Sequence, residues 1–131
     1  LQGGARMFGG TDLRLLGRAL AGRFGLFYLT TDDQGTLRRH LGAGKAAIVN
    51  VGGNREGHPG LLSDGGHYVA VLGEEGGLFT VADPKSSPEK YGPKYPHRRA
   101  AIRRAGVFLR ISPADLESDC LLRSPRYHLF G

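Results

Sequence analysis

Residues 65–84 have the sequence GGHYVAVLGEEGGLFTVADP, in which two apolar runs flank a short segment of glutamate and glycine. Runs of this length, rich in Val, Phe and Thr and joined by Glu74–Gly77, predict a β-hairpin. In an antiparallel hairpin His67 would begin the first strand and Asp83 would follow the second, so both would lie at one end. There a carboxylate can hold an imidazole in one tautomer, as in the base and orienting partner of a nucleophilic catalytic site.

Two amphipathic helices are predicted before the hairpin. Apolar residues at helical spacing favour a helix that begins at Thr11 and is closed by Gly25. The apolar positions are Leu13, Leu16, Leu20 and Phe24 in this helix, and Leu37 and Leu41 in a second, shorter one. The segment before the second helix matches a capping box, with Thr31 as the cap and Gln34 reaching back to it.

The other segments favour a sheet with helical insertions. Further strands are predicted at residues 26–30, 46–51, 107–111 and 127–130. Polar loops at 52–64 and 85–96 flank the hairpin, and a basic helix is predicted at 97–105. Ser112 followed by Pro113 is typical of a helix cap and first helical residue. The predicted fold class is α+β, a mostly antiparallel sheet packed with helices in a single domain.

The composition is that of a folded globular domain. Of the 131 residues, 40% are hydrophobic and 23% are charged, which excludes a disordered chain. No apolar run reaches the length that spans a membrane, and Leu1–Gly4 lack the basic start of a signal peptide. Because residue 1 is not methionine, the sequence leaves open whether an amino-terminal segment has been lost, and with it the localisation.

Positive charge gathers in the carboxy-terminal third of the chain. Eighteen Lys and Arg against twelve Asp and Glu give a net charge of +6. Much of this excess comes from Arg98, Arg99, Arg103, Arg104 and Arg110. Such a patch could attract nucleic acid, an anionic polymer or an acidic peptide. No aromatic-rich nucleic-acid motif accompanies it, so the sequence favours a solvated helix face over a nucleic-acid site.

The order of these segments, with LGAGKAAIVNV at 41–51, GGHYVAVLG at 65–73 and GLFTVADP at 77–84, resembles a known family. It is similar to the bacteriocin-processing (double-glycine leader) peptidase-like family of bacterial, papain-like cysteine peptidases, over roughly residues 9–84. The resemblance implies a papain-like fold, a peptide or protein substrate, no metal or organic cofactor, and an extracellular or cell-surface protein in preference to a cytoplasmic one.

The resemblance also assigns site residues. It implies that His67 is the general base and acid and that Asp83 orients it. Gly66 would leave the approach to the imidazole free of a side chain, and Pro84 would turn the chain so that Asp83 points back at the ring. In the neighbouring loop, Lys85, Lys90 and Lys94 would favour acidic substrates.

The family's nucleophile has no counterpart in the sequence. The Cys-Gly-Pro motif that opens a helix in the family, and the glutamine before it, are absent. The single cysteine excludes an internal disulfide, and Cys120 follows a predicted helix at 113–119. There the helix dipole, Glu117 and Asp119 disfavour a thiolate, so a buried, unreactive thiol is expected.

Two functions remain open at this point. Residues 1–131 would be the carboxy-terminal, larger part of a peptidase domain whose nucleophilic cysteine lies outside the sequence, and this chain alone would be inactive. Alternatively, the chain would be a catalytically inactive relative that binds peptides or docks on a partner such as a transporter. Acyl transfer to an amine in place of water stays possible in the first case.

The remaining histidines give weaker signals. His58, Asp64 and His67 are a poor set of metal ligands, because a loop histidine, an aspartate and a strand-start histidine lack further partners. Surface or half-buried positions are expected for His40, His97 and His128.

Overall fold

The sheet contains seven strands in the order β1-β7-β2-β3-β4-β6-β5, and every neighbouring pair is antiparallel. The computed structural model describes residues 13–24 and 27–131. The strands are β1 (Tyr28–Thr31), β2 (Ala47–Val51), β3 (His67–Glu75), β4 (Leu78–Ala82), β5 (Ile102–Ala105), β6 (Phe108–Ile111) and β7 (Tyr127–Phe130). The structure therefore confirms the α+β class and the mostly antiparallel sheet.

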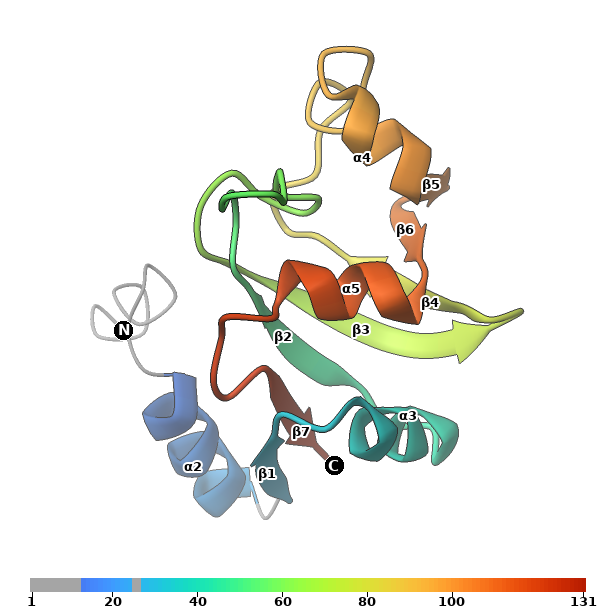
Figure 1. The fold of residues 1–131 in the computed structure, drawn as a ribbon. Coiled ribbons are helices and arrows are strands. Elements are labelled where there is room, and N and C mark those ends of the chain that lie inside the picture. Colours follow the sequence, from blue (N-terminus) through green and yellow to red (C-terminus); the bar gives the residue numbers. More distant parts are fainter. Residues whose placement is uncertain (1–12, 25–26) are drawn as a thin grey trace.

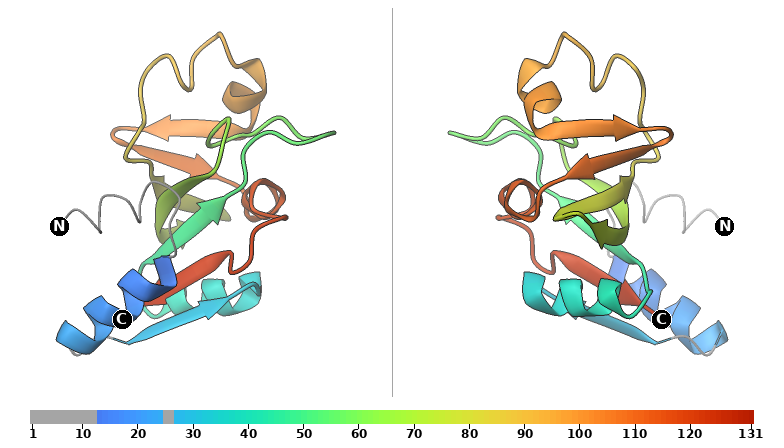
Figure 2. Two further views of the ribbon diagram at one scale, coloured as in Figure 1. Left: turned by 90° about the vertical axis from the view of Figure 1, so that its left-hand side faces the viewer. Right: turned by 90° about the vertical axis from the view of Figure 1, so that its right-hand side faces the viewer.

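Four helices accompany the sheet in the described part of the chain. They are α2 (Leu13–Phe24), α3 (Gln34–Gly42), α4 (Pro96–Ala101) and α5 (Pro113–Asp119). Helices α3 and α5 lie on the same face of the sheet (Figures 1 and 2), whereas α4 lies beyond it, beside β5. None of the helices in the described ranges is long and apolar enough to cross a membrane.

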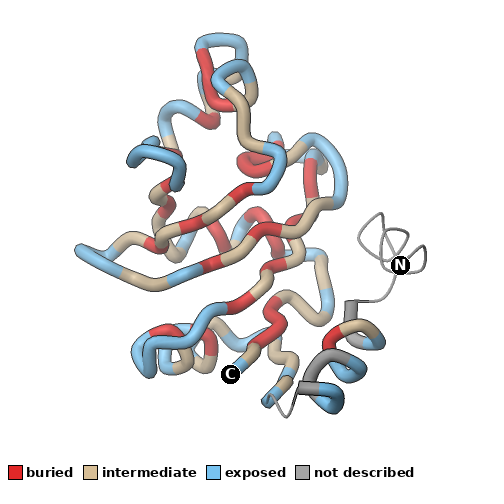
Figure 3. Tube along the Cα trace, turned by 180° about the vertical axis from the view of Figure 1, so that it is seen from behind, coloured by how far each residue is buried: buried red, intermediate tan, exposed pale blue. Residues whose placement is uncertain are grey.

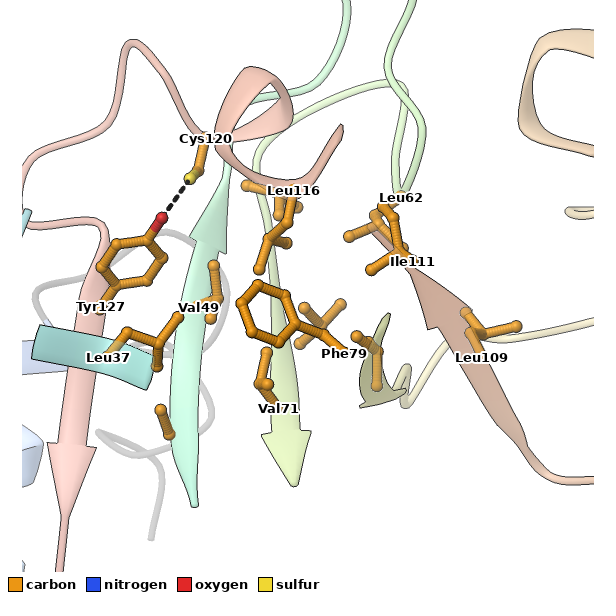
Figure 4. Close-up of a cluster of buried hydrophobic side chains, with 14 of the residues drawn as sticks. Leu37, Val49, Leu62, Val71, Phe79, Leu109, Ile111, Leu116, Cys120 and Tyr127 are labelled. Atoms are coloured by element: carbon orange, nitrogen blue, oxygen red, sulfur yellow. Dashed lines mark hydrogen bonds between the residues drawn. The ribbon is translucent and has the colours of Figure 1, made fainter. Parts of the chain in front are cut away.

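The hydrophobic core fills the space between the sheet and the two helices α3 and α5. Alternation along β2 buries Ala47, Val49 and Val51 on this face. Leu37 of α3 and Leu116 of α5 pack against the same face, and both are fully buried (Figure 4). Figure 3 shows the same alternation as short buried and partly buried stretches along the strands.

The predicted hairpin is present, with a shorter turn than expected. Strand β3 continues through Glu75, so only Gly76 and Gly77 form the turn. Their φ angles of 60° and 78° are left-handed, a conformation that glycine adopts without steric cost. The register shifts between Val71 and Gly73, where the strand pair has a bulge.

The predicted basic helix at 97–105 is wrong in its second half. Helix α4 ends at Ala101, and the next residues form the edge strand β5. Ile102 lies opposite Ile111 of β6 and is buried, and Gly106 turns the chain with φ +64°. Pairing with β6 therefore overrides the local helical pattern.

The cap of α3 also differs from the prediction. Asp33 is the N-cap, and its carboxylate accepts hydrogen bonds from the backbone amide and hydroxyl of Thr36. Thr31 accepts from the Asp33 amide, and Gln34 donates to the carbonyl of Pro113 instead of reaching back. The capping box is thus replaced by a single aspartate cap.

Several other local predictions are confirmed. Ser112 caps α5 by accepting from the Asp115 amide at 3.1 Å, and Pro113 is its first residue. Helix α2 and strand β7 occur where the sequence predicts them. The predicted helix ends Thr11 and Gly25 lie outside the described residues, as do the loop 1–10 and Leu26.

Candidate functional site

The site begins with two side chains at one end of the β3–β4 hairpin. His67 is the first residue of β3, and Asp83 follows Ala82, the last residue of β4. Alternation places His67 on the same face as the buried Val69, and Asp83 on the same face as the buried Val81. Both side chains therefore approach the core face that carries α5.

His67 and Asp83 form a direct hydrogen bond. His67 Nε2 lies 2.7 Å from Asp83 Oδ1. The Asp83 side chain is fully buried, and the His67 side chain is only 8% exposed. The predicted proximity of the two residues is therefore confirmed. No hydrogen bond joins the other ring nitrogen, Nδ1, to any residue in the described part of the chain.

Three further donors hold the Asp83 carboxylate. Lys90 Nζ and the Tyr91 hydroxyl each lie 2.6 Å from Oδ2, and the Lys85 amide lies 2.9 Å from Oδ1. Burial alone would raise the pKa of Asp83. The hydrogen bonds from His67, Lys90, Tyr91 and Lys85 outweigh it and hold the pKa well below its usual value. The carboxylate is therefore charged at neutral pH.

The charge on Asp83 decides which nitrogen of His67 can act as a base. An ionised carboxylate only accepts hydrogen bonds, so Nε2 must carry the donated hydrogen. In the neutral ring Nδ1 then has the lone pair. The site can thus accept a proton at Nδ1 while Asp83 stabilises the imidazolium that results.

Sequence analysis missed Tyr91 as a site residue and expected a different role for Lys90. Burial and the contact with Asp83 both raise the pKa of the Tyr91 hydroxyl, so it stays a hydrogen-bond donor. Lys90 was expected to attract acidic substrates, but it is ion-paired with Asp83 and largely buried. That expectation is wrong for Lys90. Both residues lie in a loop without periodicity, which gives no sequence signal for such contacts.

Arg123 occupies the space that Gly66 leaves open. A Cβ on Gly66 would lie 2.6 Å from Arg123 Nη2, so a side chain there would displace the guanidinium. The same Nη2 lies 3.5 Å from the carbonyl oxygen of Gly52, the residue after β2. Gly66 therefore makes room for the Arg123 guanidinium, a role that its position in the sequence did not indicate.

Cys120 is a structural thiol. It is fully buried, and its Sγ lies 3.6 Å from the Glu117 carbonyl oxygen and 3.7 Å from the Tyr127 hydroxyl oxygen (Figure 4). Burial is the main cause that raises the pKa of Cys120 to about 11, and Asp119 and Glu117 add to it. The expectation of a buried thiol is confirmed, and the raised pKa disfavours the reactive thiolate.

The three residues considered as metal ligands bind different partners. His58 Nε2 lies 2.8 Å from Asp119 Oδ1, and Asp64 is paired with Arg98 at 2.7 Å. With His67 bound to Asp83, the three side chains do not share a site. The described residues contain no cluster of three or more His, Cys, Asp or Glu suited to a metal ion.

The second histidine–carboxylate pair, His58–Asp119, fixes the loop at 52–64. The buried Asp119 carboxylate also accepts from the backbone amides of Leu61 and Leu62, at 2.8 and 3.0 Å. Leu61 and Leu62 are themselves buried, so this loop is packed and not simply polar as predicted.

The predicted solvated arginine face is wrong for Arg98. Its side chain is 2% exposed and donates to Asp64 and to the carbonyls of Gly60 and Lys90. The guanidinium carbon also lies 4.1 Å from the centre of the Tyr95 ring. Arg98 therefore ties the loops 52–64 and 85–96 together.

The remaining histidines are held by local contacts. His40 and His97 are half-buried as expected, bound to the carbonyls of Ala46 and Gly60. His128 is buried within the sheet, with Nδ1 2.7 Å from the Tyr28 hydroxyl, which corrects the predicted surface or half-buried position. In the β1–β7 register His128 lies opposite Thr30, and Tyr28, two residues away on the same face of β1, reaches it diagonally.

Comparison with known proteins adds no assignment. The chain matches no family model, no curated protein and no solved structure.

Proposed function

We propose that the chain is the carboxy-terminal, larger part of a papain-like cysteine peptidase domain. In this proposal His67 transfers the proton and Asp83 orients His67. The hydrogen bond between His67 Nε2 and Asp83 Oδ1 carries the proposal, because it leaves Nδ1 as the basic nitrogen. The ionised, fully buried Asp83 supports it further, since it would favour the imidazolium.

The proposed reaction passes through an acyl-enzyme. His67 Nδ1 removes the proton from a cysteine thiol, and the thiolate attacks the carbonyl carbon of the peptide bond. The imidazolium then returns its proton to the leaving amine as the C–N bond breaks. Water, or an acceptor amine, attacks the thioester next, and His67 again takes the proton. No cofactor is needed for these steps.

The nucleophilic cysteine would belong to a segment outside these 131 residues. Cys120 is unsuitable because it is buried and because its pKa is raised to about 11. The thiol must approach His67 from the side of Nδ1, where no described residue forms a hydrogen bond. A helix amino-terminus would lower the pKa of the incoming thiol.

The alternative is a catalytically inactive peptide-binding module. It is favoured by the absence of an accessible thiol in the sequence, whose only cysteine is buried. In that case His67 and Asp83 would be a structural pair like His58 and Asp119, and the loops beside them would bind peptide without turnover.

The first experiment is to sequence the coding DNA upstream of the codon for Leu1. An in-frame cysteine at the start of a predicted helix supports the peptidase, and another residue at that position supports the binding module. The extended protein is then treated with a peptidyl epoxide and digested for mass spectrometry. We expect the upstream cysteine to be modified and Cys120 to stay unmodified in the folded protein.

The role of His67 is tested on the same extended protein. His67→Ala should lower kcat/KM for peptide cleavage by about 10³-fold or more, because the thiol loses its base. His58→Ala is the matched control and should leave kcat/KM within about threefold, since His58 binds Asp119 on another element. Equal losses in the two variants would contradict the proposed role.

A further inference from the structure

An open groove lies next to the residues that support Asp83. It has a volume of about 420 Å³ and is lined by residues of the β4–α4 loop, α4 and β5. Pro88 and Pro93 line it from the loop, and Ile102 lines it from β5. The volume falls within the range of ligand sites in proteins, ~300–1,000 Å³.

Two cations point into this groove without an acidic partner. Arg99 of α4 and Arg104 of β5 line it, and both are exposed. Neither arginine takes part in the ion pairs recorded among the described residues. No described carboxylate therefore neutralises Arg99 or Arg104, and an anionic ligand would meet two unpaired guanidinium groups.

The groove shares a residue with the candidate site. Tyr91 lines the groove, while its hydroxyl donates to Asp83 Oδ2 at 2.6 Å. Lys90, the adjacent residue, binds the same carboxylate oxygen. A ligand in the groove would thus lie one side chain away from the carboxylate that orients His67.

The lining favours a peptide over a nucleic acid. Bases of single-stranded nucleic acid need exposed aromatic faces on which to stack. The only aromatic residue of the groove, Tyr91, is 5% exposed and its hydroxyl is engaged. The exposed prolines Pro88 and Pro93 beside two exposed arginines instead suit a short chain of apolar and acidic side chains.

We propose that this groove, between residues 88–93 and 99–104, binds an acidic peptide segment through Arg99 and Arg104. The segment would present two carboxylates to the two guanidinium groups and its apolar atoms to Pro88 and Pro93. Its role as a substrate subsite rests on the proposed peptidase function, but the binding itself does not.

Binding is measured on this chain with fluorescein-labelled hexapeptides. Each carries two glutamates separated by one, two or three residues among Ala, Pro and Leu, and a glutamine version of each is the uncharged control. We expect one glutamate spacing to bind, and its glutamine version to bind at least about tenfold more weakly. Equal binding of the two versions, or tighter binding of a labelled oligothymidine, would overturn the proposal.

Charge-matched variants distinguish binding in the groove from general attraction by the net positive charge. Arg99→Ala and Arg104→Ala should each weaken binding of the glutamate peptide about tenfold. Arg103→Ala also removes one positive charge from β5, but alternation places Arg103 on the face away from the groove. The affinity of the Arg103→Ala variant for the glutamate peptide should therefore change less than about twofold. An equal loss in Arg103→Ala and Arg104→Ala would mean general attraction by charge and would overturn the assignment.

These experiments do not depend on turnover. If the extended protein shows no cleavage but the glutamate peptide binds through Arg99 and Arg104, the peptidase proposal is wrong and the peptide-binding proposal for the groove is supported. If cleavage depends on His67 but glutamate and glutamine peptides bind equally, the peptide-binding proposal is wrong and the peptidase proposal is supported.

Discussion

The two histidine–carboxylate pairs of this protein look alike at first sight. In each, histidine Nε2 lies close to an aspartate Oδ1, at 2.7 Å for His67–Asp83 and at 2.8 Å for His58–Asp119. Both aspartate side chains are fully buried. Distance and burial alone therefore do not distinguish a candidate catalytic pair from a structural one.

The other hydrogen-bond donors distinguish them. Asp119 accepts from two consecutive backbone amides, of Leu61 and Leu62, so the carboxylate organises a loop. Asp83 accepts from the side chains of Lys90 and Tyr91 and from one amide. Losing Asp119 leaves backbone groups unpaired in the core, whereas losing Asp83 mainly releases side chains.

Replacing Asp119 by alanine should have the largest effect. It leaves two buried backbone amides without an acceptor, and we expect the free energy of unfolding to fall by about 3 kcal/mol or more. Urea denaturation followed by circular dichroism measures this loss. A loss smaller than that of Asp83→Asn would reverse the distinction drawn between the two pairs.

Asp83→Asn should cost less at neutral pH, about 1–2 kcal/mol, and should change the response to acid. The folded-state pKa of Asp83 lies below its unfolded value, so its ionised form stabilises the protein above the usual carboxyl pKa. This stabilisation is lost as the pH falls from about 4 towards the folded-state pKa.

The check is unfolding free energy against pH for both proteins. The difference between the natural protein and Asp83→Asn should shrink as the pH falls below about 4. A difference that grows as the pH falls below about 4 would contradict the direction of the pKa shift. Glu56→Gln, an exposed position, is a suitable control.

His58→Ala should lower the free energy of unfolding by about 1–1.5 kcal/mol, because one hydrogen bond to the buried Asp119 is lost. The two backbone amides remain bound, so the loss is smaller than for Asp119→Ala. Thermal unfolding at neutral pH gives this value. No measurable change would mean that the amides alone fix the loop at 52–64.

Gly66→Ala should have the smallest effect, about 0.5 kcal/mol or less, since the new Cβ meets only the end of the flexible Arg123 side chain. Gly53→Ala is the contrasting variant. Gly53 has φ +80°, and its Cβ would lie 2.6 Å from the Asp64 carbonyl oxygen, so about 2 kcal/mol or more should be lost. Equal losses of unfolding free energy in Gly66→Ala and Gly53→Ala would show that the Arg123 side chain cannot move aside.

The features that sequence analysis predicted well depend on neighbours in the chain. Two apolar runs joined by a segment of glutamate and glycine predicted the β3–β4 hairpin, and with it the proximity of His67 and Asp83. Ser112 and Pro113 gave the start of α5. Each of these follows from a pattern within a few residues, which local backbone preferences are sufficient to produce.

The missed features depend on contacts that no local pattern specifies. Strand β5 pairs with β6 although residues 102–105 have a helical pattern, and Arg98 is buried where it binds Asp64, 34 residues earlier in the sequence. His58 binds a carboxylate 61 residues later. Loop residues such as Lys90 and Tyr91 have no periodicity, so only the folded arrangement brings them to Asp83.

The position of β7 has a consequence for the order in which the protein can assemble on the ribosome. Strand β7 lies between β1 and β2 and pairs with both, whereas β1 and β2 do not pair with each other. While the chain is being made, β2, β3 and β4 can join as soon as they leave the exit tunnel. Strand β1, although synthesised first, must wait until Tyr127–Phe130 has emerged to connect it to the sheet.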